Sequence, residues 1–154
     1  MKLLDFYKDV AIILAGIIAF TTFLSGLLEY ARQGRQRKAE TFLHMRRRFL
    51  ETPLFQHILN LLATDSDQLC QVSIQDRRNF GGFLEEVAIM VDSKLLSPEL
   101  AHYMFGYYVL LTARSEHFWE DLDRSGPYWR LFWRFAGDME RLEASPPPVR
   151  HIAV

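Results

Sequence analysis

A run of nineteen residues without a charge, Val10 to Leu28, constrains this chain more than any other feature. As an α-helix the run would extend about 28 Å, which matches the roughly 30 Å thickness of a bilayer's hydrocarbon core. Eleven of its residues are Val, Ile, Leu or Phe. Each of these favours insertion by about 0.3–0.6 kcal/mol. The sequence therefore predicts a transmembrane helix over residues 10–28.

Two other interpretations of the run fit less well. A cleaved signal peptide carries its positive charge before a shorter apolar stretch, whereas here most of the positive charge follows the run. A buried soluble helix of this length would need cover on all sides, which a chain of 154 residues can hardly supply. We therefore expect lipid to cover the run.

The flanking charges predict how the span is oriented. Two lysines and two aspartates precede the run, whereas seven basic residues follow it within twenty positions: Arg32, Arg35, Arg37, Lys38, Arg46, Arg47 and Arg48. Positive charge favours the cytoplasmic side and attracts anionic lipid headgroups. We expect a bacterial inner-membrane protein with its N-terminus outside and its C-terminal part in the cytoplasm.

The same basic residues could instead bind nucleic acid, but the composition argues against that partner. Lys+Arg 18 against Asp+Glu 19 leaves a net charge of −1, so no global positive field exists to attract phosphate. We therefore expect membrane lipids, and not nucleic acid, as partners.

The remaining sequence is typical of an all-α protein. Apolar residues recur at spacings of three and four, and no convincing stretch alternates with period two. We expect a transmembrane helix that continues into a cytosolic bundle of about four to five helices. The expected segments are a short periplasmic N-terminus at 1–9, the span at 10–28, a basic juxtamembrane helix at 29–50, the bundle at 51–143 and a flexible tail at 144–154.

Four short motifs are typical of helix starts and divide the bundle: Thr52-Pro53, Ser73 with Asp76, Ser97-Pro98 and Gly126-Pro127. The predicted helix that follows Ser97 contains the apolar residues Leu100, Tyr103, Met104, Tyr107, Tyr108 and Leu111.

Three local features give further expectations. A polar loop is predicted over residues 64–72, and Arg134 and Asp138 have the i,i+4 spacing of a helical ion pair. Gly81 and Gly82 lie inside a predicted helix, where each costs about 1 kcal/mol of helix propensity. We therefore expect a neighbouring helix to approach closely there.

The order of these features resembles that of small bacterial membrane proteins with one N-terminal span, a basic juxtamembrane helix and a helical cytosolic domain. The residues that carry the resemblance are Glu29-Tyr30, Arg37-Lys38-Ala39-Glu40, Arg48-Phe49, Pro53-Leu54-Phe55, Phe83-Leu84-Glu85-Glu86-Val87-Ala88, Phe105-Gly106-Tyr107-Tyr108, Phe118-Trp119 and Tyr128-Trp129. The resemblance covers most of the chain and implies an architecture without a particular activity. In layout alone, the chain is also similar to the pore-forming membrane accessory proteins of RNA-targeting CRISPR systems.

Motifs for common chemistries are absent from the sequence. No phosphate-binding glycine loop, His-Glu-x-x-His motif or paired-cysteine motif occurs. The five histidines are scattered, and no metal-ligand spacing with a carboxylate or cysteine is recognised. We expect no metal, no cofactor and no enzymatic activity, and we interpret the sole cysteine, Cys70, as an idle thiol in a loop.

One weak catalytic candidate remains. Arg37 and His44 match the spacing of the Arg and His that act on RNA in HEPN-type ribonucleases, which the pair resembles in that respect. Lys38 stands where that family has a polar residue, and the pair lies on the juxtamembrane helix instead of a late one. A solvated basic face is the simpler interpretation.

Glu85 and Glu86 lie in an otherwise apolar helix, so one of them could point inward. An inward carboxylate needs a hydrogen-bond donor, for example Arg114, Arg130, Tyr107 or an indole N–H, or its pKa rises. We interpret the pair as a buried polar anchor in preference to a catalytic acid. The aromatic residues of the C-terminal half could line a ligand pocket but are more typical of a core: Tyr107, Tyr108, Trp119, Tyr128, Trp129 and Trp133.

Small residues form one stripe along the predicted span: Ala11, Ala15, Ala19, Thr22 and Gly26. Such stripes allow transmembrane helices to approach closely. Because one span has no partner within its own chain, the stripe predicts a homo-oligomer or an unidentified protein partner. The expected function is a self-associating interaction module, with a pore-forming defence effector and a membrane-tethered ribonuclease as alternatives.

Overall fold

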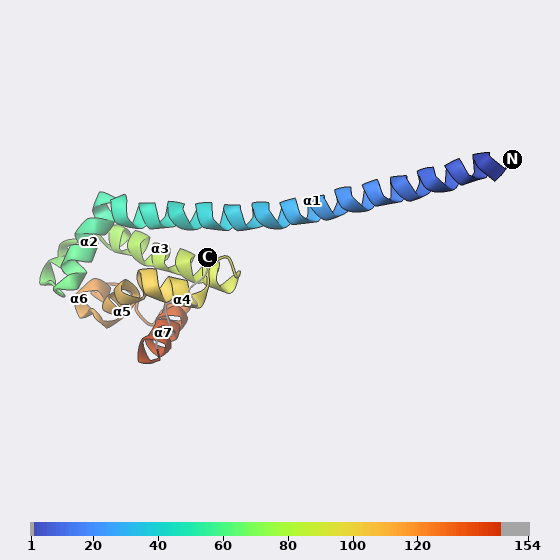
Figure 1. Ribbon diagram of the computed structural model, residues 1–154. Coiled ribbons are helices and arrows are strands. Elements are labelled where there is room, and N and C mark those ends of the chain that lie inside the picture. The colour runs from blue at the N-terminus through green and yellow to red at the C-terminus, as the bar shows by residue number, and fades with distance from the viewer. Residues whose placement is uncertain (1, 146–154) are drawn as a thin grey trace. The chain divides into compact units, whose positions relative to one another are not determined.

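The computed structural model describes the backbone of residues 2–145 and the side chains of residues 14–30, 33 and 39–145. Over that backbone the protein is all-α, without a β-strand (Figure 1). The chain divides into two units, Met1–Ala39 and Glu40–Val154. The expected all-α class is confirmed.

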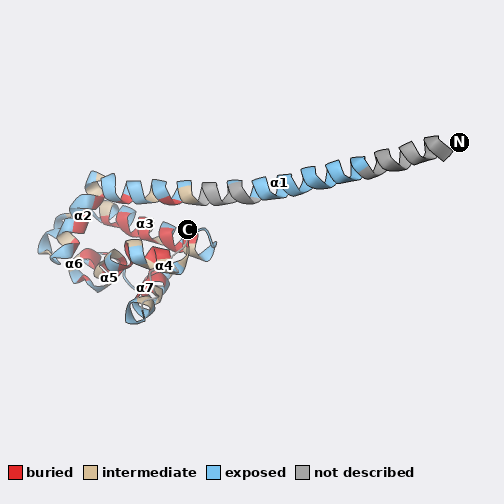
Figure 2. Ribbon diagram, in the orientation of Figure 1, coloured by how far each residue is buried: buried red, intermediate tan, exposed pale blue. Residues whose placement is uncertain are grey.

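The first helix, α1 (Lys2–Glu51), is continuous through the predicted span and the predicted juxtamembrane helix. Every residue from Leu14 to Tyr30 is exposed, and the corresponding part of α1 is pale blue in Figure 2. Among the residues that the structure describes, no helix combines the length and the apolar character needed to cross a bilayer.

Over its described residues, the second unit contains the end of α1 and six further α-helices, with two short 3₁₀ helices and one π-helix among them. In order these are α2 (Pro53–Ala63), η1 (Asp67–Gln71), α3 (Ile74–Asp92), α4 (Pro98–Ala101), η2 (His102–Gly106), α5 (Tyr107–Arg114), α6 (Glu116–Trp119), η3 (Pro127–Trp129) and α7 (Arg130–Ala144). The α3 helix packs against α2 and α7, and α5 packs against the same two helices. The described part of the second unit thus contains more helices than the four to five expected for the bundle, and two of them, α4 and α6, are only four residues long.

The predicted helix starts at Thr52, Ser73 and Ser97 are confirmed, but of the three hydroxyl groups those of the two serines alone accept a hydrogen bond from the first turn of the helix. The Ser73 hydroxyl accepts a hydrogen bond from the Asp76 N–H at 3.1 Å, and the Ser97 hydroxyl accepts one from the Leu100 N–H at 3.2 Å. Thr52 occupies the N-cap position of α2, but its hydroxyl donates back to the carbonyl of Arg48 at 2.6 Å. The Gly126-Pro127 motif begins a 3₁₀ turn, and α7 starts only at Arg130.

Two local expectations were wrong. The predicted loop over residues 64–72 contains the 3₁₀ helix η1, which Ser66 caps by accepting from the Gln68 N–H. Arg134 does not pair with Asp138; it forms an ion pair with Asp92 of α3. Because α7 lies against α3, the tertiary partner replaces the partner one turn away on the same helix.

The predicted helix after Ser97 is interrupted by a π-helix over His102–Gly106. A π turn holds more residues than an α turn, so the residues within and after it no longer follow the 3.6-residue period set before it. Tyr103 and Tyr107, which that period places on an apolar stripe, are 66% and 60% exposed. Phe105 and Val109 are buried instead.

The core of the second unit is built around phenylalanine rings. Phe49, from the end of α1, is 1% exposed and stacks on Phe83 of α3 at a centroid distance of 5.3 Å. Its ring also meets the edge of Phe105 at 5.2 Å. The last turns of α1 therefore belong to the packed core, which gathers residues from all the longer helices of the unit.

The glycine pair in α3 is explained by one close contact. A Cβ placed on Gly81 would lie 2.7 Å from the Trp129 ring, whereas one on Gly82 would meet no atom within 4 Å. Trp129 is held by Trp119, whose ring centroid lies 5.1 Å away. The expected close approach is confirmed for Gly81 alone, and it comes from the 3₁₀ turn that precedes α7.

We predict opposite effects for alanine at the two glycines. Gly81→Ala should lower the free energy of unfolding by about 1–2 kcal/mol, because displacing a packed ring outweighs the gain in helix propensity. Gly82→Ala should raise it by up to about 1 kcal/mol, because only the propensity changes. Urea denaturation of both variants measures this. Equal effects of the two substitutions would contradict the assigned contact.

Candidate functional site

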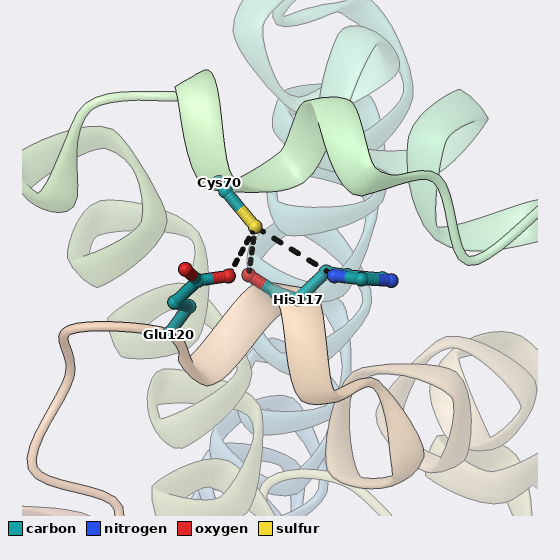
Figure 3. Close-up of side chains that lie close together, drawn as sticks. All are labelled: Cys70, His117 and Glu120. Atoms are coloured by element: carbon teal, nitrogen blue, oxygen red, sulfur yellow. Dashed lines mark hydrogen bonds between the residues drawn. The ribbon is translucent and has the colours of Figure 1, made fainter.

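Three side chains with metal-ligating atoms converge between η1 and α6: Cys70, His117 and Glu120. The Cys70 Sγ lies 2.5 Å from a carboxylate oxygen of Glu120 and 3.7 Å from the Nδ1 of His117. Figure 3 shows the Cys70 sulfur lying between the Glu120 carboxylate on one side and the backbone carbonyl and Nδ1 of His117 on the other. Cys70 and His117 are partly buried and Glu120 is exposed, so the group is open to solvent on one side.

The Glu120 carboxylate controls the protonation of Cys70. Its hydrogen bond with the thiol, followed by partial desolvation and the carboxylate's negative charge, raises the pKa of Cys70 above the ordinary value. The positive charge of Arg77 acts in the opposite direction. At neutral pH the side chain is therefore a protonated thiol that donates to Glu120.

A buried arginine fixes the backbone of this site. Arg77 of α3 is 1% exposed, and its Nη1 donates to the carbonyls of Phe118 at 2.8 Å and Glu120 at 2.7 Å. The same nitrogen reaches the carbonyl of His117 at 3.2 Å, and Nε donates to the carbonyl of Val72 at 3.1 Å. One guanidinium thus holds both the end of α6 and the residue that follows η1.

The start of α6 is fixed by a second contact. The Ser115 hydroxyl donates to the Asp65 carboxylate at 2.6 Å and accepts from the Phe118 N–H at 3.1 Å. Asp65 lies in the turn that follows α2, with a positive φ of 43°. A four-residue helix is too short to be stable alone, so these contacts set the direction of His117 and Glu120.

Sequence reasoning missed this group, because Cys70 is separated from the other two residues by about fifty positions. The signal that could have found part of it is the three-residue spacing of His117 and Glu120, which places them one helical turn apart. No pattern in the sequence marks Arg77 as the residue that orients them.

The two glutamates of α3 point in different directions. Glu85 accepts a hydrogen bond from the backbone N–H of Phe132 at 3.1 Å, in the first turn of α7. That turn has no capping side chain of its own, so Glu85 supplies the missing acceptor. Glu86 instead pairs with Arg48 at 2.7 Å on the surface. The hydrogen-bond donor to Glu85 is thus a backbone amide, and not the side chain of Arg114, Arg130 or Tyr107 or an indole N–H.

Glu85 also lines a cavity of about 410 Å³ together with Arg78, Asp123, Tyr128 and Trp129. Burial raises the pKa of Glu85 above its ordinary value of 4.5, and the hydrogen bond from Phe132 partly opposes that shift. The aromatic residues around the cavity differ in exposure, since Tyr128 is 87% exposed and Trp129 is 9% exposed. Both Trp119 and Trp133 donate their indole N–H to backbone carbonyls.

The predicted basic and catalytic residues are only partly within the described side chains. Those of Arg32, Arg35, Arg37 and Lys38 lie outside them, whereas Arg46 and Arg47 are exposed. His44 is exposed and lines a hollow of about 550 Å³ with Met45, Arg48, Glu86 and Met90. The HEPN-like pair therefore has one member whose side chain the structure does not describe.

The predicted small-residue stripe is open along its described part. Ala15, Ala19, Thr22 and Gly26 are exposed, and a Cβ on Gly26 would meet no atom within 4 Å. Ala11 lies outside the described side chains.

No protein-family profile, curated protein or solved structure matches this chain. The assignment of function therefore rests on the residues of the chain itself.

We predict that Arg77→Met lowers the free energy of unfolding by about 3–4 kcal/mol, because it leaves several buried carbonyls without a donor. Arg78→Met, at the neighbouring exposed position, should change it by less than about 0.5 kcal/mol. Chemical denaturation of both variants measures the difference. A loss at Arg77 no larger than that at Arg78 would contradict the role of the buried guanidinium.

We predict that Glu85 makes stability rise as the pH falls. A raised pKa means that the folded protein takes up a proton at a pH where the unfolded chain, with a pKa of 4.5, is still ionised. Stability from this group is therefore gained as the pH falls through the raised pKa toward 4.5. Glu85→Gln keeps an acceptor for the Phe132 N–H and carries no charge. Its free energy of unfolding, relative to that of the wild type, should therefore fall as the pH is lowered over that range. A pH-independent difference would refute the prediction.

Proposed function

We propose that the chain is a single-pass protein of the bacterial inner membrane, anchored by residues 10–28, that displays its all-α second unit in the cytoplasm. In this proposal the second unit is an interaction module without enzymatic activity, and the anchor self-associates. The observation that carries the proposal is the nineteen-residue run without a charge.

The exposure of the described part of this run supports a lipid environment. Eight large apolar side chains are at least 42% exposed there: Leu14, Ile17, Ile18, Phe20, Phe23, Leu24, Leu27 and Leu28. On a helical wheel they spread over about 220°, about twice the width of the apolar stripe of an amphipathic helix, so packing on a single neighbouring surface would leave many of them in water. Soluble monomers rarely expose a contiguous apolar patch of this kind.

The hydroxyl groups within the run are compatible with lipid. Thr21 and Thr22 donate to the carbonyl of Ile18 at 2.9 and 2.8 Å, and Ser25 donates to the carbonyl of Thr21 at 2.8 Å. Each hydroxyl proton is therefore satisfied within its own helix, which removes much of the cost of placing it in hydrocarbon.

These hydrogen bonds also bear on the pore alternative. A ring of spans would need Thr21, Thr22 and Ser25 to face water in a lumen, but their protons are already donated to the backbone. Each hydroxyl oxygen keeps lone pairs that accept from water, so the pore stays an alternative, which dye leakage from vesicles tests. The ribonuclease alternative has less support, because His44 lies beside the Arg48–Glu86 ion pair and the methionines of an apolar hollow.

We predict that the full-length protein sediments with membranes, resists alkaline carbonate extraction and is released by detergent. A fluorescent reporter fused to the C-terminus should be active in the cytoplasm, and an alkaline phosphatase fused there should be inactive, because the basic residues keep that side inside. Replacing Ile17 and Ile18 with lysine should move the protein to the soluble fraction. A wild-type chain that is soluble without detergent, or a phosphatase active at the C-terminus, would overturn the proposal.

We predict that Gly26→Ile weakens self-association in membranes, because a branched side chain on the small-residue stripe prevents close approach of two helices. Gly16→Ile is the matched control, since Gly16 is equally open but lies about 100° from the centre of the stripe on a helical wheel. Cross-linking or energy transfer between labelled spans in vesicles measures both variants. An equal effect of the two changes would refute the stripe, and dye leakage from vesicles by the wild type would favour the pore.

A further inference from the structure

We propose that Cys70, His117 and Glu120 form a binding site for one zinc ion, which joins η1 to α6. The three residues supply a sulfur, an imidazole nitrogen and a carboxylate oxygen, and these ligand atoms all lie within 4.8 Å of one another. Sulfur, nitrogen and oxygen donors at tetrahedral positions are the set that Zn²⁺ takes in proteins. The hard cations Ca²⁺ and Mg²⁺ prefer oxygen alone.

The separations between the ligand atoms fit such an ion with one small movement. Two ligands of a tetrahedral zinc, with Zn–S near 2.3 Å and Zn–N or Zn–O near 2.0 Å, lie about 3.5 Å apart. The Sγ of Cys70 is 3.7 Å from the Nδ1 of His117, so this pair is already at that spacing. The carboxylate of Glu120, 2.5 Å from the same sulfur, would move outward by about 1 Å.

That movement is open to Glu120, because its side chain is exposed while its backbone is held by Arg77. The backbone that carries the other two ligands, Cys70 and His117, is fixed by buried neighbouring residues. Leu69, next to Cys70 in η1, is fully buried, and Phe118, next to His117 in α6, is fully buried as well. Ligands carried on fixed backbone lose little freedom when an ion binds, which favours affinity.

Charge is compatible with a divalent cation. On binding, Zn²⁺ displaces the proton of the Cys70 thiol to solvent, so that the thiolate and the Glu120 carboxylate together balance the two charges of the ion. Arg77 contributes a further positive charge, but its nitrogen faces the carbonyls of His117, Phe118 and Glu120 and not the ligand atoms. The fourth position of the tetrahedron is left to water, as in zinc sites with three protein ligands.

The test uses the full-length chain, purified in mild detergent and stripped of metal with a chelator. Cobalt(II), which reports thiolate ligation through a charge-transfer band in the near ultraviolet, should bind once per chain, and zinc should displace it. Because Cys70 is the sole cysteine, protection from alkylation by zinc reports on this site without any substitution. Saturating zinc should raise the unfolding midpoint by roughly 5–10 °C.

Three variants and two controls locate the site. Cys70→Ser, His117→Ala and Glu120→Gln should each weaken zinc binding by more than the roughly 10- to 100-fold that loss of an outer-shell partner costs. His57→Ala and Glu116→Gln, which replace exposed residues of the same types, should bind as the wild type does. No stoichiometric metal on the wild type, no protection of its thiol, or any of the three variants binding like the controls would overturn the proposal.

Discussion

The packing of the second unit depends on the buried guanidinium of Arg77. Arg77 lies within the core at 1% exposure, and its guanidinium donates to four carbonyl oxygens from two separate stretches of chain. Placing a charge there is costly unless every donor finds a partner. The benefit is that the end of α6, too short to hold its own geometry, is fixed relative to α3. That arrangement positions the three side chains of the candidate site, Cys70, His117 and Glu120.

Some of this structure can be predicted from the sequence, because local rules decide it. The helical class follows from the three- and four-residue spacing of apolar residues, and the starts at Ser73 and Ser97 follow from hydroxyl capping. Even the closeness of a neighbour at Gly81 follows from the cost of glycine in a helix. Each of these features depends on residues within a few positions of one another.

The remaining features depend on tertiary contacts that no local pattern encodes. Arg134 pairs across to Asp92 because α3 lies beside α7, and the sequence alone offers Asp138 as an equally good partner. Cys70 contacts Glu120 because Arg77 and Ser115 orient the short helix α6, which Glu120 follows directly. Interactions over forty to fifty positions determine the candidate site, so sequence reasoning could name neither its members nor the residue that holds them.

The π-helix at His102–Gly106 has a consequence for how related chains can diverge. Its wide turn absorbs about one residue more than a regular turn, and this offset lets Leu100, before it, and Phe105 and Val109, within and after it, all reach the core. Removing one residue from this segment would convert the wide turn into a regular α-turn and leave α5 facing the same way relative to α4, with Val109 still in the core. Between Pro98 and Arg114, therefore, the wide turn is the place where a related chain can be one residue shorter and still keep the same faces of α4 and α5 in the core.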